Sequence, residues 1–407
     1  MIKKIPVAQL RVGMYVSDMN AGWMNHPFLR NSMKIDSEAQ LAKIFAAGIK
    51  EVFIDTERGP DVGDAPTAEE AAREVEADLE RLAEAPESRP VIPRASLAEE
   101  LSRARSSFGE ATRLIRNIMD DVRLGRQVEL DAVKPVVEKI TNSVIRNSNA
   151  MMTMRRLQQR DDYTFLHSVS VCAMLATLAK AMDMDMATIH QVALGGMLHD
   201  IGYVRVNQEV LNKPGKLSNE EYRHVKSHVV LGADLLRQLP GIPKIAHEIL
   251  EHHHERYDGS GYPRGLKGEE ISTMGRMAAI VDVYDAITSD RVYHPGMNPG
   301  AAMRKLFDWS KSHFDPALFQ VFVKSIGIYP VGALVLLESG RLGVVVEQRE
   351  KSLLQPMVRV IFDTRRGHYL PPQDVDLSRP LGGGGGDRIV SHESPKKWGI
   401  DLPRFLA

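Results

Sequence analysis

The spacing of apolar residues divides the chain into three regions. Residues 1–60 alternate short apolar runs with turn residues and carry one helical pattern, SEAQLAKIFAAG. Through residues 96–327 apolar positions recur at helical spacing, with short interruptions that contain Gly, Pro or Asn. Residues 328–380 hold two apolar strand pairs, with turns at ESGR and TRRG. These patterns predict a mainly α protein with a small α/β N-terminal domain, an all-helical domain and a β-rich appendage.

The segments outside these regions favour exposed chain. Residues 61–95 are rich in Pro, Gly, Glu and Ala and contain one charged helical pattern, which indicates a charged linker. Five consecutive glycines, Gly382–Gly386, predict that residues 381–407 form a flexible tail. The helical segment from Leu97 to Leu157 is long enough to support a homodimer.

Charge and composition narrow the classes of partner. The 407 residues include 52 Lys and Arg against 53 Asp and Glu, so no global charge favours a nucleic acid polymer. The single cysteine, Cys172, lies in an apolar run and is expected to pack as a small hydrophobe. No uninterrupted apolar run approaches the ~18 residues of a membrane span, and the N-terminus lacks a signal-peptide core. We therefore expect a cytoplasmic chain without a membrane partner.

Candidate ligands crowd into the stretch HEILEHHHERYDGSGYP, residues 247–263. It places four histidines beside several carboxylates and then turns through two glycines. Such polar groups cost free energy when they are buried without partners, and a divalent cation satisfies several of them at once. A metal site is the leading interpretation, and a solvated His-rich helix face is the alternative.

Other helical segments between residues 150 and 325, the core of the helical domain, add further candidates. Nine of the fourteen histidines fall between His167 and His254. Ser218 and Glu221 form a predicted capping box at the start of one of these segments. The additional candidates are His167, the pair His199 and Asp200 that follows Gly195 and Gly196, the i,i+4 pair His224 and His228, and the pair Asp282 and Asp285. Imidazoles and carboxylates without a thiolate suit Fe, Mn or Zn, and two ions that share a carboxylate would explain the number of ligands.

The order and spacing of these residues resemble the HD-GYP family of the HD phosphohydrolases. The resemblance covers residues 150–325 and rests on His167, His199-Asp200, His228, HHE at 253–255, DGSGYP at 258–263 and DVYD at 282–285. The N-terminal GMYV and GIKEVFIDTERG are similar to an accessory domain that precedes HD-GYP domains in some bacterial proteins.

The resemblance implies a phosphodiesterase that hydrolyses cyclic di-GMP to pGpG, and further to GMP, with a hydroxide activated at a two-metal centre. Iron or manganese is expected, and zinc accepts the same ligands. Asp200 is the expected bridge between the ions. Family members with a third ion use a glutamate where this chain has Tyr163, so two ions are expected. The implied ligands are His167, His199, Asp200, His228, His253, His254 and Asp282.

The expected catalytic residues are Asp200, Arg291 and Tyr203. The resemblance implies that Arg291 contacts the substrate phosphate, and a guanidinium supplies a bidentate contact there. Lys213 and Lys216 are further phosphate candidates, with ordinary solvated lysines as the alternative. Tyr203 stands where the family usually has a lysine, so a hydrogen-bond donor replaces a cation.

The sequence is compatible with two other functions. The loss of a cation at Tyr203 is compatible with a catalytically weak or inactive sensor that binds cyclic di-GMP. A phosphohydrolase of another nucleotide is the second alternative. Tyr262, in the turn at the mouth of the site, is expected to contact substrate. The same turn or the N-terminal domain is expected to contact a signalling partner.

Overall fold

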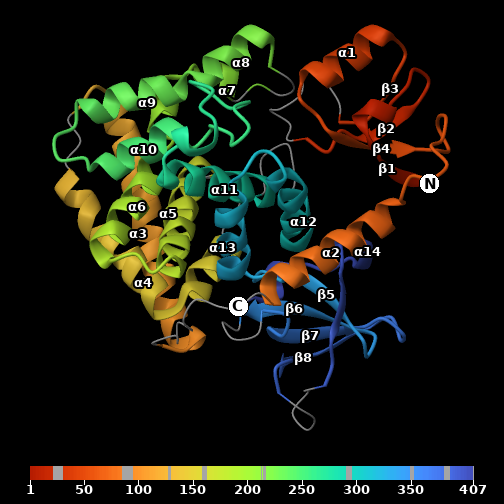
Figure 1. The fold of residues 1–407 in the computed structure, drawn as a ribbon. Helices are drawn as coiled ribbons and strands as arrows, with labels where there is room; N and C mark the ends of the chain where they lie inside the picture. Colours follow the sequence, from red (N-terminus) through yellow and green to blue (C-terminus); the bar gives the residue numbers. More distant parts are fainter. Residues whose placement is uncertain are drawn as a thin grey trace. The chain divides into compact units, whose positions relative to one another are not determined.

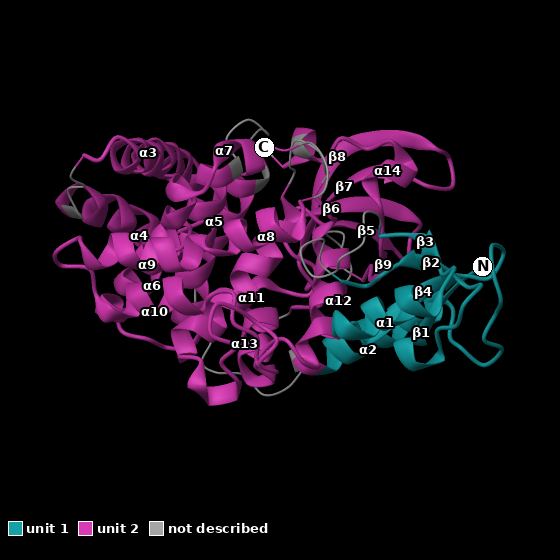
Figure 2. Ribbon diagram, turned by 90° about the horizontal axis from the view of Figure 1, so that it is seen from above, with its two compact units in different colours: residues 1–81 teal, residues 82–407 magenta. Residues whose placement is uncertain are grey.

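The computed structural model describes residues 1–21, 31–84, 95–126, 130–157, 163–211, 213, 217–289, 296–348, 353–379 and 386–406. The chain forms two compact units, Met1–Arg81 and Leu82–Ala407 (Figure 2). Figure 1 follows the elements in chain order: strands and one short helix first, then a series of helices, then a second sheet. This order confirms the predicted fold class.

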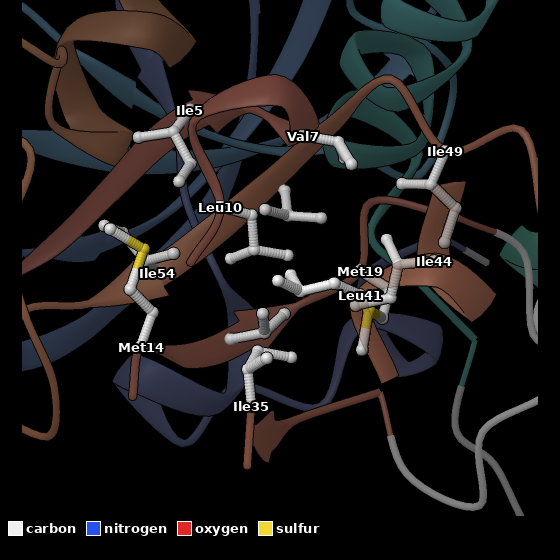
Figure 3. Close-up of a cluster of buried hydrophobic side chains, with 12 residues drawn as sticks. Ile5, Val7, Leu10, Met14, Met19, Ile35, Leu41, Ile44, Ile49 and Ile54 are labelled. Atoms are coloured by element: carbon white, nitrogen blue, oxygen red, sulfur yellow. The ribbon is translucent and has the colours of Figure 1, made fainter. Parts of the chain in front are cut away.

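The first unit is a four-stranded antiparallel sheet covered by one short helix. Its strands are β1 (Ile2–Pro6), β2 (Tyr15–Asp18), β3 (Met33–Lys34) and β4 (Glu51–Asp55), in the order β1-β4-β2-β3. A short 3-10 turn, η1 (Val7–Gln9), follows β1, and α1 (Glu38–Ala46) precedes β4. Figure 3 shows the core of this unit, a cluster that includes Ile5 and Ile54 from the sheet and Leu41 and Ile44 from α1.

Helix α2 (Ala68–Glu84) forms where the sequence indicates a charged linker. Ala71, Val75 and Leu79 recur every four residues and are buried. Because four-residue spacing puts them on one helical face, the helix has an apolar side despite its charge. The first compact unit accordingly extends to Arg81.

The second unit begins with two long helices that pack against each other. Helix α3 (Leu97–Arg123) starts at a capping box in which Ser96 and Glu99 satisfy each other's backbone N–H groups. Helix α4 (Leu130–Leu157) is antiparallel to α3. Lys139 pairs with Glu110 and Arg146 pairs with Glu100, so residues later in α4 contact residues earlier in α3. The segment expected to support a dimer is therefore a helical hairpin.

Helix α5 (Tyr163–Ala181) lies at the centre of the helical bundle (Figure 1). It contacts α3, α4, α6 (Met186–Leu198), α11 (Thr273–Thr288) and α13 (Pro316–Ile326). The stretch Thr164–Ala181 is long and apolar enough to cross a membrane, but 72% of it is buried inside the protein. A helix that is apolar on all sides is expected at such a core position.

Two glycines near the end of α6 allow close helix packing. A Cβ atom on Gly195 would lie 2.6 Å from Ile249 Cδ1, and one on Gly196 would lie 2.9 Å from Leu175 Cδ1. Ile249 belongs to α10 and Leu175 to α5. The end of α6 is thus held tightly between these two helices.

The other helical elements surround this centre. They are η3 (Ile201–Arg205), α7 (Gln208–Leu211), α8 (Asn219–Lys226), α9 (His228–Arg237), α10 (Lys244–His252), η4 (Gly268–Glu270), α11 (Thr273–Thr288), α12 (Pro299–Ser310) and α13 (Pro316–Ile326). The predicted capping box at Ser218 and Glu221 is present at the start of α8.

The C-terminal region forms a five-stranded antiparallel sheet. The predicted strand pairs are β5 (Leu334–Leu337) with β6 (Arg341–Glu347), and β7 (Met357–Asp363) with β8 (His368–Asp376). The strand order is β8-β7-β6-β5-β9. Met152 and Leu157 of α4 pack against the core of this sheet, so the appendage is attached to the helical bundle.

The expectation of a flexible tail differs from the structure. Strand β9 (Ile389–His392) pairs with β5, and α14 (Pro395–Trp398) and η5 (Leu402–Phe405) follow it. Ile400, Phe405 and Leu406 are buried in the core of the sheet. Because glycine dominates the start of this segment, the apolar residues after it do not stand out in the sequence. Their buried surface stabilises the segment against the sheet.

The tail should therefore contribute to stability. We expect Phe405→Ala to lower the free energy of unfolding of the second unit by about 2–4 kcal/mol, since truncating a buried aromatic leaves a cavity. Val390→Ala, at a side chain that is 57% exposed on β9, should change it by less than about 0.5 kcal/mol. Denaturant unfolding of both variants tests this, and equal midpoints would show that the tail adds nothing.

Candidate metal centre

Three histidines of the candidate centre sit at helix ends that orient their rings. His199 follows α6 and His253 follows α10, whereas His228 is the first residue of α9, one residue beyond the cap of α8. In each case Nδ1 lies 2.7 or 2.8 Å from the carbonyl oxygen three residues earlier. Carbonyls in the last turn of a helix lack intrahelical donors, so they are free to accept these bonds. An Nδ1–H group that donates to the carbonyl leaves Nε2 directed into the site, where its lone pair can bind a cation.

A fourth histidine, His167, is oriented by a carboxylate from a distant part of the chain. It lies in the first turns of α5, and its Nδ1 is 2.7 Å from Asp285 Oδ2 on α11. Arg155 of α4 donates through Nε to Asp285 and through its Nη2 to Ser289 Oγ. Asp285 is thus a buried link between α4 and the His167 ring.

Asp200 lies between two sets of imidazoles. Its Oδ2 is 3.3 Å from His199 Nε2 and 3.6 Å from His167 Nε2. Its Oδ1 is 3.5 Å from His228 Nε2 and 3.6 Å from His253 Nε2. One carboxylate therefore presents a different oxygen to each set, which is the geometry of a bridging ligand.

Asp282 repeats this arrangement from α11. Its Oδ1 is 3.0 Å from His167 Nε2 and 3.7 Å from His199 Nε2, whereas its Oδ2 is 3.8 Å from His254 Nδ1. Among the described residues, the possible ligand atoms form two groups with all distances within 4.8 Å. The groups are Asp200, His228, His253 and His254, and His167, His199 and Asp282.

The electrostatics of the second group favour bound protons when no cation is present. Burial disfavours charge on His167, but its hydrogen bonds to Asp282 and Asp285 outweigh this and raise its pKa to about 9. Asp200 and Asp282 likewise overcome burial and raise the pKa of His199. Burial opposes ionisation of Asp282, yet its hydrogen bonds to His167 and His199 hold its pKa well below the usual range. A cation that binds here must displace protons from imidazole.

The first group behaves differently. Burial lowers the pKa of His228 to about 4, and burial followed by the nearby His253 lowers the pKa of His254. Both rings are therefore neutral at pH 7, and their lone pairs are available without proton release. The two halves of the centre thus differ in the proton cost of binding a cation.

The arrangement fits divalent cations. His199 Nε2 is buried and has no hydrogen-bond partner among the described residues. Two carboxylates, Asp200 at 7% and Asp282 at 6% exposure, share this pocket with the imidazoles. Buried anions and lone pairs of this kind are satisfied by a metal bound through N and O atoms.

Two tyrosine rings cover the outer side of this cluster. Tyr203 of η3 stacks on His228, with ring centroids 4.1 Å apart and an interplanar angle of 12°. Tyr262 stacks on His254 at 4.6 Å and 27°. Tyr203 stands where the family resemblance implies a lysine. A ring that packs on a candidate ligand therefore takes the place of a cation.

The turn at residues 258–263 is fastened to the end of α10. The buried carboxylate of Glu255 accepts hydrogen bonds from the backbone N–H groups of Arg264 and Leu266 at 2.8 and 3.0 Å. Asp258 Oδ1 accepts from the backbone N–H and the hydroxyl of Ser260 at 2.9 and 2.6 Å. These bonds hold Tyr262 against His254.

The remaining predicted residues have other positions. The ammonium of Lys213 donates to both carboxylate oxygens of Glu221 at 2.8 Å. Arg291, Lys216 and the side chain of Tyr163 lie outside the described residues. His224 is exposed and accepts a hydrogen bond from the backbone N–H of Asn207.

The sequence did not reveal the role of Asp285 or the involvement of Arg155. Arg155 precedes Asp285 by 130 residues, and it lies in a helical pattern like any other basic residue. The only available signal was the DVYD spacing, which puts Asp285 about one turn from Asp282 on an apolar helix.

Two family descriptions match this chain. Residues 2–133 match a domain of unknown function (DUF3391), and residues 140–318 match the HD domain. The second match contains every residue of both ligand groups.

Three curated relatives illustrate the similarity. A cyclic di-GMP phosphodiesterase of Pseudomonas aeruginosa is 42% identical over 402 residues, which cover 98% of this chain and 94% of the relative. A cyclic di-GMP phosphodiesterase of Vibrio cholerae is 34% identical over 48% of this chain and 44% of its own length. A 3'3'-cGAMP-specific phosphodiesterase of Vibrio cholerae is 34% identical over 44% of this chain and 41% of its own length.

The link through Asp285 is open to a direct test. Asp285→Asn keeps the side-chain shape but removes the charge that holds His167 Nδ1. We expect the affinity for Mn(II) to fall by about 10–100-fold, since partners behind metal-binding histidines act on this scale. Asp234→Asn is the matched control, because the described ion pair of Asp234 is with Arg237 on the surface of α9. Competition titration that gives the two variants the same affinity would rule out this role for Asp285.

Proposed function

Because this chain belongs to the HD-GYP family of metal-dependent phosphohydrolases, we propose that it hydrolyses cyclic di-GMP. The observation that carries this proposal is the division of the centre into two ligand groups that share the carboxylates of Asp200 and Asp282. The relative that is 42% identical along nearly the whole chain supports the same activity.

We propose that the centre holds two divalent ions, with iron or manganese favoured and zinc acceptable to the same donors. One ion would be held by His167, His199 and Asp282, and the other by His228, His253 and His254. Asp200 would contribute to both, since each of its oxygens faces a different group. When bound, such ions polarise the phosphate and supply hydroxide near neutral pH.

The residues of the chain determine where this chemistry takes place. The bonds from Nδ1 to the backbone keep His199, His228 and His253 in one tautomer, so their Nε2 atoms need no rearrangement. Asp285 does the same for His167. The burial of Asp200 and Asp282 limits water, which strengthens electrostatic interactions with a bound phosphate.

On the substrate side we propose a phosphate contact from Arg291 and contacts from Tyr203 and Tyr262. Tyr203 can donate a hydrogen bond to the leaving oxygen but carries no positive charge. Lys213 is a weaker candidate than the sequence implied, because Glu221 neutralises its ammonium. Lys216 remains a prediction.

The proposed first product is pGpG. Its remaining phosphodiester has the same chemical form as the bond already cleaved, so the same centre would convert it to GMP. The only membrane-length apolar helix among the described residues is mostly buried, which supports action in the cytoplasm. A homodimer, or a signalling partner at the turn of residues 258–263 or at the N-terminal domain, stays a prediction.

Two alternatives rest on particular observations. A binding-only sensor is favoured by Tyr203, which replaces a cation by an uncharged ring stacked on His228. A different cyclic dinucleotide substrate is favoured by the relative named as specific for 3'3'-cGAMP. The intact set of seven ligands favours catalysis over the sensor.

Incubation of anaerobically purified protein, loaded with Fe(II) or Mn(II), with cyclic di-GMP tests these functions when the products are resolved by chromatography. We expect conversion to pGpG by the wild type and a loss of about 1,000-fold or more in a His199→Ala, Asp200→Ala double variant, as for removal of a whole catalytic unit. A His368→Ala, Asp234→Ala double variant removes the same residue types from exposed positions and should retain the wild-type rate.

Each other outcome selects an alternative. Tight binding of cyclic di-GMP without turnover would replace the enzyme by the sensor. Turnover of 3'3'-cGAMP with none of cyclic di-GMP would replace the substrate. Equal rates in the wild type and the His199, Asp200 variant would remove the centre from the reaction.

A further inference from the structure

Two cations and two aromatic rings gather beside the candidate metal centre. The ammonium of Lys226 lies 4.5 Å from the ring centroid of Tyr222 and 4.6 Å from that of Tyr262. Arg256 Nη1 donates to Ser260 Oγ at 3.4 Å, and Ser260 lies in the same turn, residues 258–263, as Tyr262. We call Lys226, Arg256, Tyr222 and Tyr262 the cation cluster.

Among the described residues, no carboxylate forms an ion pair with either positive charge of this cluster. Neither Lys226 nor Arg256 has an ion pair within 4.0 Å among the residues that the structure describes, and Arg256 Nη1 donates only to Ser260 Oγ at 3.4 Å. Other basic residues of the same domain are paired, including Lys213 with Glu221 and Arg276 with Asp315. Both cations of the cluster are only partly exposed.

This arrangement is costly without an anion. The ammonium of Lys226 lies over two aromatic rings, and Arg256 donates to the hydroxyl of Ser260. Neither contact supplies a negative charge. Like charges held together in a partly desolvated place are stabilised when a bound anion neutralises them.

The cluster is tied to the metal centre by the chain and by stacking. Lys226 is the last residue of α8 and precedes the candidate ligand His228 by two positions. Arg256 follows His254 by two positions. The ring of Tyr262 contacts Lys226 and also stacks on His254. An anion at the cluster would therefore lie beside the centre and not in it.

We propose that Lys226 and Arg256 form a subsite for the phosphate of a cyclic dinucleotide that is not being cleaved. This inference rests on the proposed function. A cyclic dinucleotide carries two phosphodiesters in one covalent ring, so fixing one at the metal centre confines the other to a narrow range of distances. A guanidinium and an ammonium are the side chains best suited to bind it.

The subsite has a consequence for specificity. A simple phosphodiester has no second phosphate and gains nothing from Lys226 or Arg256. The two cations therefore add binding energy for cyclic dinucleotides alone, and this energy acts on the ground state and the transition state alike. Their removal should raise KM and leave kcat nearly unchanged.

Steady-state kinetics of Lys226→Gln, Arg256→Gln and the double variant test the subsite with two substrates, cyclic di-GMP and bis(p-nitrophenyl) phosphate. We expect each single substitution to raise KM for cyclic di-GMP about tenfold, the loss of one charged hydrogen bond. The kcat for cyclic di-GMP and both constants for the simple diester should stay within about twofold. Lys226→Arg should restore most of the affinity.

Arg223→Gln is the matched control. Arg223 lies on the same helix, α8, and is exposed, and its described hydrogen bond is to the carbonyl of Asn219. It removes one positive charge three positions from Lys226, so it reports the general effect of charge on substrate attraction. We expect it to leave KM for both substrates unchanged within about twofold.

The other outcomes overturn the subsite in distinguishable ways. Wild-type KM in the double variant would show that the cations do not contact substrate. Equal losses with both substrates, or in Arg223→Gln, would assign the effect to the fold or to general charge. A wild type that cleaves the simple diester but neither binds nor cleaves cyclic di-GMP would refute the proposed substrate, and the subsite with it.

Discussion

The structure depends on two buried carboxylates that are each shared between two sets of imidazoles. Asp200 and Asp282 lie below 10% exposure, and among the described residues the groups of opposite potential charge within 4.0 Å of their oxygens are histidines. Leaving two such anions without positive charge would cost several kcal/mol each. The helices α5, α6, α9, α10 and α11 meet at this point. Each carries a candidate ligand, either within the helix or directly after its last residue.

Local and long-range structure contribute differently to the centre. Three of the histidines are oriented by carbonyls only three residues away, at helix ends where such carbonyls are unsatisfied. His167 lies within a helix, where no such carbonyl is free, and it takes Asp285 and, behind it, Arg155 of α4. Helix α4 also packs against the C-terminal sheet, so one helix connects that sheet to a candidate ligand.

Much of this centre was predictable from the sequence, for a physical reason. Metal ligands must be of a few residue types and must lie near helix ends or on one helix face, so His199-Asp200, His253-His254 and Asp282 left a recognisable pattern. Stacking of Tyr203 on His228 and the cation cluster left none, because they depend on how α8, η3 and the turn after α10 meet in space. The buried face of α2 and the ordered tail were obscured by charge and glycine, which dominated the local composition.

We propose that the two shared carboxylates hold two ions. Anomalous X-ray diffraction from crystals grown with Mn(II) locates each ion directly. We expect two manganese peaks per chain, one beside His167 and His199 and the other beside His228 and His253, with Asp200 in contact with both. A single peak, or two peaks that Asp200 does not bridge, would rule out the two-ion centre.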